Sequence, residues 1–61
     1  MITELNGTFH IRLSANDRGH VLDAMQESEI EAVFFGTSRD DLLVVLSAME
    51  DAVFLTMMFG R

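Results

Sequence analysis

The stretch ITELNGTFHIRLS, residues 2–14, decides the first half of the fold. Its Asn6-Gly7 pair is the preferred sequence for a two-residue type I′ turn between antiparallel strands. After the turn, polar and apolar residues alternate from position 8 to position 14, which is typical of a strand with one buried and one solvated face. We therefore predict a β-hairpin whose two strands cover residues 2–5 and 8–14.

The next two segments carry different periodicities. Residues 16–28 place Val21 and Met25 four positions apart, which predicts a helix with one buried side. Residues 29–35 alternate between acidic and apolar side chains before the alternation is lost. We predict a second long strand there, ended by the glycine that follows it.

The second half of the chain contains two strongly apolar runs. In residues 38–49, apolar side chains recur at the spacing i, i+3, i+4 and i+7 starting from Leu42, and Ser38 is a suitable N-cap, so we predict a second helix. In residues 52–59, seven of the eight side chains are apolar. We predict a last strand there that is covered on both faces, because only such strands are apolar on both sides.

These elements give the order β-β-α-β-α-β. We predict a single α+β domain, residues 1–61, built as a two-layer sandwich with two helices on one face of a four-stranded sheet. A domain of this size buries only about 60% of the surface that its unfolded chain exposes. The core of such a domain rarely supplies more than about 3–5 kcal/mol, and small domains are usually supported by disulfides, metals or association. Because the chain has no cysteine, association is the expected support.

Two helices cover only one face of a sheet, so the other face would expose apolar side chains of strands 29–35 and 52–59. We predict that this face pairs with a second copy in a two-fold homodimer. In the alternative, the last strand lies at the centre of the sheet and the chain covers it alone. The residues predicted to self-associate are Val33, Phe35, Val53, Leu55, Met57 and Phe59.

The chain has far more acidic than basic side chains. Ten carboxylates oppose four arginines, there is no lysine, and the net charge is −6. This balance disfavours direct binding to nucleic acids, which are polyanions, and favours a basic protein partner. In the alternative, the carboxylates only confer solubility. The predicted acidic partner surface consists of Asp23, Glu27, Glu29, Glu31, Asp40, Asp41, Glu50 and Asp51.

Basic and imidazole side chains gather between positions 10 and 20. His10, Arg12, Arg18 and His20 run from the end of a strand into the start of a helix, where free backbone N–H groups can bind anions. They form a possible anion or phosphate site. The alternative is a solvated strand face followed by a capped helix, since no glycine-rich cradle accompanies them. We predict no catalytic residues, no metal site and no cofactor.

The function that follows is a non-enzymatic, acidic protein–protein interaction module. We expect a homodimeric stoichiometric inhibitor, for example a phage protein that blocks a nucleic-acid-handling host system. The alternative is a small anion- or phosphate-ligand-binding module that uses residues 10–20, and a small enzyme that uses the same histidines is a third hypothesis. We see no signal peptide and no segment long enough to span a membrane, so we expect a cytoplasmic protein.

Overall fold

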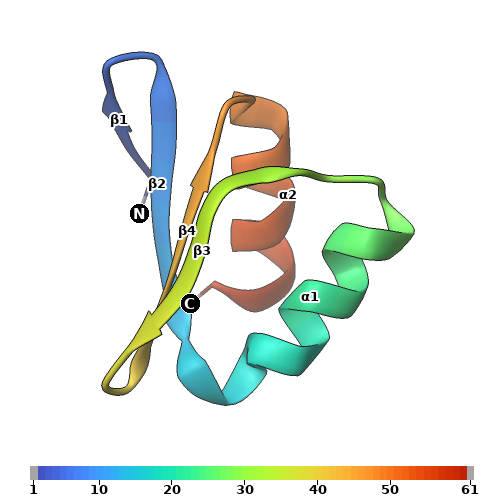
Figure 1. Ribbon diagram of the computed structural model, residues 1–61. Coiled ribbons are helices and arrows are strands. Elements are labelled where there is room, and N and C mark those ends of the chain that lie inside the picture. Colours follow the sequence, from blue (N-terminus) through green and yellow to red (C-terminus); the bar gives the residue numbers. More distant parts are fainter. Residues whose placement is uncertain (1, 61) are drawn as a thin grey trace.

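The computed structural model describes residues 2–60 and confirms a small α+β domain (Figure 1). Four strands form one antiparallel sheet in the order β1-β2-β4-β3, and both helices lie on the same face of it. The elements are β1 (Ile2–Leu5), β2 (Thr8–Ser14), a 3₁₀ turn (Ala15–Asp17), α1 (Arg18–Glu27), β3 (Ala32–Ser38), β4 (Asp41–Leu46) and α2 (Met49–Phe59).

The predicted hairpin of β1 and β2 is confirmed. Asn6 and Gly7 adopt φ angles of 53° and 83°, the left-handed conformation that a type I′ turn requires at both positions. The turn sets the register, which places Ile2 opposite Ile11. As a result, the apolar side chains of β2 all point toward the helices, and its polar side chains lie on the uncovered face of the sheet, the face opposite the helices.

The predicted helix over residues 16–28 forms as the 3₁₀ turn followed by α1, with Val21 and Met25 buried as expected. The predicted strand over residues 29–35 begins three residues later, and it is not ended by Gly36 but continues to Ser38. The reason for the late start is the exit of α1, where Glu29 adopts a φ of 55° and the N–H of Ile30 donates to the carbonyl of Met25 at 2.8 Å. Residues 28–31 form this end of the helix, so β3 starts only after them.

The predicted helix over residues 38–49 is wrong. Residues 39 and 40 form the turn between β3 and β4, where Arg39 has a φ of 58°, and the apolar run that follows is the strand β4. It lies between β2 and β3 at the centre of the sheet. Val45, on the uncovered face, is still only 7% exposed because it lies between His10 and Phe34 of the neighbouring strands. Because a central strand is buried on both faces, every residue of its apolar run can be covered. A helix with one buried side would cover only part of this run.

The predicted strand over residues 52–59 is also wrong, because this segment belongs to helix α2. Ala52 and Leu55 point at the sheet and are fully buried. Glu50 and Asp51 lie in the first helical turn, where carboxylates interact favourably with the helix dipole. The element order is therefore β-β-α-β-β-α, with the predicted four strands and two helices but with the last two elements exchanged.

The core is one apolar cluster between the sheet and the two helices. The strands β2 and β4 supply its sheet side, and each helix supplies two fully packed side chains. Its buried members are Ile11, Leu13, Val21, Met25, Leu42, Val44, Leu46, Ala52 and Leu55.

We expect the substitution Leu55→Ala to lower the free energy of unfolding by about 2–5 kcal/mol, because it leaves a cavity in this cluster. Such a loss approaches the whole stability of a domain this small. Leu5→Ala is the matched control, since Leu5 is exposed on the edge strand β1 and its truncation should cost about 0.5 kcal/mol or less. Urea unfolding followed by circular dichroism measures both values, and equal losses would contradict the assignment of Leu55 to the core.

Candidate interaction surface

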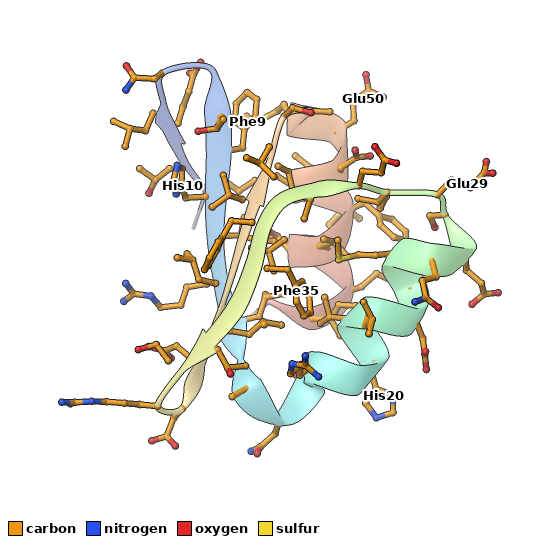
Figure 2. All side chains as sticks on the ribbon, viewed as in Figure 1. Phe9, His10, His20, Glu29, Phe35 and Glu50 are labelled. Atoms are coloured by element: carbon orange, nitrogen blue, oxygen red, sulfur yellow. The ribbon has the colours of Figure 1, made fainter. Side chains whose placement is uncertain are left out.

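The most unusual feature of the surface is the outer half of α2. Five large apolar side chains lie there in contact with solvent, and Met57 is the most exposed of them at 80%. Figure 2 shows α2 and α1 together on one side of the sheet. We call this surface the outer face of α2, and it consists of Met49, Val53, Phe54, Met57 and Met58.

Helical spacing makes these side chains one continuous surface. Met49, Val53 and Met57 follow one another at intervals of four residues, and Phe54 and Met58 form a second row beside them. The only charged side chain within this arc is Glu50, at the N-terminal end of the helix. Residues scattered singly would need no explanation, whereas a contiguous apolar patch of this kind is a candidate interaction surface.

The predicted self-association residues divide between this face and other places. Val53 and Met57 belong to the outer face of α2, whereas Leu55 is fully buried in its own core and Phe59 is partly buried against it. The remaining two lie on β3: Val33, exposed at an irregularity in the pairing with β4, and Phe35, which packs against the core on the helix side. These six residues therefore do not form one surface.

Sequence reasoning missed Phe54 and Met58 because it assigned residues 52–59 to a strand, and it missed Met49 because it placed this residue on the buried side of a helix over residues 38–49. Interpreting residues 49–59 as a helix would have predicted that these three residues are exposed. It places only Ala52, Leu55 and Phe59 on the side of the sheet and leaves the other apolar residues outward.

Six of the eight predicted partner-surface carboxylates gather at one end of the molecule. They come from the second half of α1, the connection to β3 and the first turn of α2, and Figure 2 shows Glu29 and Glu50 at this end. Asp40 and Asp41 lie at the other end of β4, a strand of about 17 Å. The acidic end, as we call it, consists of Asp23, Glu27, Glu29, Glu31, Glu50 and Asp51.

The single ion pair among residues 2–60 lies outside the acidic end. The guanidinium of Arg12 is 3.8 Å from a carboxylate oxygen of Asp41, and both side chains are more than half exposed. Because solvent screens the two charges, such a pair contributes little to the free energy of unfolding. The carboxylates of the acidic end therefore have no partner of opposite charge among the described residues.

The four candidate anion-binding residues do not converge. His10 and Arg12 lie on the uncovered face of the sheet, and the Nε2 atom of His10 is 3.1 Å from the hydroxyl of Thr8. Arg18 and His20 lie on α1, in the other layer, and His20 points into solvent (Figure 2). The guanidinium of Arg18 lies 5.6 Å from the ring centre of Phe35, an arrangement that favours a cation–π contact.

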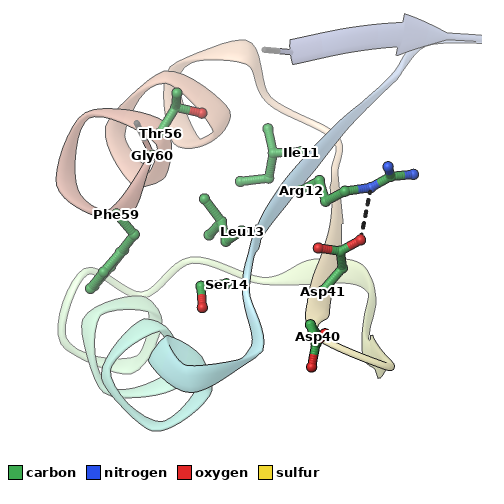
Figure 3. A pocket seen from close by; sticks show the side chains of 9 residues that line it. All are labelled: Ile11, Arg12, Leu13, Ser14, Asp40, Asp41, Thr56, Phe59 and Gly60. Atoms are coloured by element: carbon green, nitrogen blue, oxygen red, sulfur yellow. Dashed lines mark ion pairs between the residues drawn. The ribbon is translucent and has the colours of Figure 1, made fainter.

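Open hollows lie on both faces of the sheet, and two of them lie among residues 2–60. The larger, of about 410 Å³, lies beside β2 and the C-terminal end of α2, and the Arg12–Asp41 pair lies at its rim (Figure 3). The hydroxyl of Thr56 nearby is buried without a partner among the described residues. The second hollow, of about 350 Å³, lies on the uncovered face of the sheet beside His10 and Arg12. Neither contains a set of three side chains that could hold a metal ion, within residues 2–60.

Comparison with protein families, with curated proteins and with solved structures finds no match to this chain. Within residues 2–60, neither helix has the length and apolar character needed to cross a lipid bilayer.

The contact between Arg18 and Phe35 is testable by a double-mutant cycle. We expect Arg18→Gln and Phe35→Leu to be coupled by about 0.5–1 kcal/mol in urea unfolding, the value of a partly exposed cation–π pair. Arg12→Gln combined with Phe35→Leu is the control. Arg12 lies on the opposite face of the sheet from Phe35, so equal coupling in the two cycles would contradict a specific contact.

Proposed function

We propose that this protein is a non-enzymatic protein–protein interaction module that forms a homodimer through the outer face of α2. The observation that carries the proposal is the contiguous apolar surface of Met49, Val53, Phe54, Met57 and Met58, which no third layer covers within residues 2–60.

The size of the surface fits a second copy as its occupant. The exposed fractions of the five side chains correspond to an apolar patch of roughly 400 Å², the size of the largest patch on a typical monomer, which is often a functional surface. A stable dimer buries about 800 Å² of each partner, of which about two thirds is apolar in homodimers. The patch therefore supplies most of the apolar area that a two-fold dimer needs.

The distribution of charged side chains also favours the outer face of α2 as the dimer interface. Each copy carries a net charge of −6, so two copies repel each other over most of their surfaces. The outer face of α2 carries only Glu50, at one end. Two copies can meet there without placing many carboxylates against each other.

The acidic end supports the second part of the proposal, which concerns a partner. Basic protein surfaces are common on proteins that handle nucleic acids, because they bind phosphates. We propose that the dimer occupies such a surface with its acidic ends and acts as a stoichiometric inhibitor, as a phage protein would against a host system. Its association with the partner would be fast and sensitive to salt.

The dimer is tested by light scattering behind a sizing column, where we expect twice the mass of one chain. Met57→Asp should yield a folded monomer, because it places a charge at the most exposed point of the outer face without entering the core. Leu5→Asp is the matched control, since Leu5 is an equally apolar but isolated exposed residue on β1, and this variant should stay dimeric.

Two results would contradict this interface. One is a monomeric wild-type protein at high micromolar concentration. The other is a dimer that survives Met57→Asp but dissociates with Val33→Asp, which would place the contact at the edge strand β3.

The partner surface is tested by calorimetric titration with an octa-arginine peptide as a probe of basic chemistry. We expect binding at low salt that weakens at least tenfold when three carboxylates of the acidic end are neutralised by Glu27→Gln, Glu29→Gln and Glu31→Gln. Asp40→Asn with Asp41→Asn is the control and should have a smaller effect. A role for the acidic end would be contradicted by an affinity that does not change with ionic strength. It would also be contradicted by an equal loss of affinity in both variants.

A further inference from the structure

The methionines of this chain are unevenly distributed. Of the four among residues 2–60, only Met25 is buried in the core. Met49, Met57 and Met58 all lie on the outer face of α2, and each is more than half exposed. The surface that we propose to pair is therefore formed largely by accessible thioether side chains.

A thioether is the one group on this face with redox chemistry. Its sulfur attacks a peroxide oxygen, the O–O bond breaks, and one oxygen atom is transferred to give a sulfoxide while the peroxide is reduced to water or an alcohol. The sulfur loses two electrons in this step. The product is polar, and it resists burial in an apolar contact.

We propose that the outer face of α2 is a peroxide-sensitive interface, in which oxidation of Met57, together with Met49 and Met58, to the sulfoxides blocks pairing with a second copy. This inference rests on the proposed homodimer. It adds that hydrogen peroxide controls pairing through the same surface by oxidising these methionines.

The positions of the sulfur atoms predict that oxidation spares the fold. The three side chains extend into solvent, so a sulfoxide there replaces contacts with water and not contacts with the core. Met25 is a buried member of the core cluster and is protected there. Loss of pairing should therefore occur without loss of helix or strand.

Pairing and oxidation should also oppose each other. A copy that is paired through α2 covers its own three thioethers, so peroxide reacts with the dissociated chain. Oxidation is then faster in dilute protein than in concentrated protein, since dilution raises the fraction of single chains.

The experiment treats the whole protein with hydrogen peroxide. Mass spectrometry of proteolytic peptides assigns the added oxygen atoms, light scattering gives the mass of the particle, and circular dichroism reports the fold. We expect oxygen on Met49, Met57 and Met58 before Met25, an association constant reduced at least tenfold, and an unchanged circular dichroism spectrum.

The control variant carries Met49→Leu, Met57→Leu and Met58→Leu. Leucine has a volume similar to that of methionine and cannot be oxidised, so this variant should dimerise before and after peroxide treatment. It keeps the other two methionines of the sequence, and it therefore shows whether they contribute.

The outcomes separate this inference from the proposed function. An untreated protein that is monomeric overturns the proposed dimer and this inference with it. An untreated dimer that stays dimeric after the three methionines are oxidised overturns this inference alone. Dissociation of the leucine variant by peroxide also overturns it, because the sensitive group would then lie elsewhere.

Discussion

The packing of α2 against the sheet is the contact on which the structure depends. Ala52 and Leu55 are fully buried there, and Phe59 is partly buried beside them. The helix is only three turns long, so these three residues are all that it presents to the core. Every other apolar residue of α2 must face outward. The exposed patch is thus a direct consequence of placing an almost wholly apolar helix on the outside of a two-layer domain.

This arrangement would connect the stability of the domain with the proposed dimer in one element. A domain of this size has a small core, and additional burial of apolar surface by a second copy would add to its stability by mass action. The carboxylates at the N-terminal end of α2 interact favourably with the helix dipole, and they leave the remaining turns of the outer face free of charge. The methionines of that face provide an adaptable surface whose chemistry can be changed by oxidation.

The sequence predicted the first half of the molecule well because its signals were local. The Asn6-Gly7 turn and the alternation after it define β1 and β2, and the spacing of Val21 and Met25 defines the buried side of α1. The second half was assigned wrongly because β4 and α2 are both continuous apolar runs, and periodicity does not distinguish a buried strand from a helix in such runs. The turn at Arg39, a non-glycine residue with positive φ, gave no sequence signal. The expectation of an uncovered apolar surface survived as a proposal, although the surface lies on a helix and includes only two of the six residues named for it.

The most direct test of the central claim is a dilution series of backbone amide NMR spectra. If α2 pairs with a second copy, the resonances that shift with concentration should belong to residues 49–58, and carbon chemical shifts should show that these residues are helical. The amides of β1 and of the turn between β3 and β4 should not move. Spectra that are independent of concentration, or shifts concentrated along β3, would contradict the account.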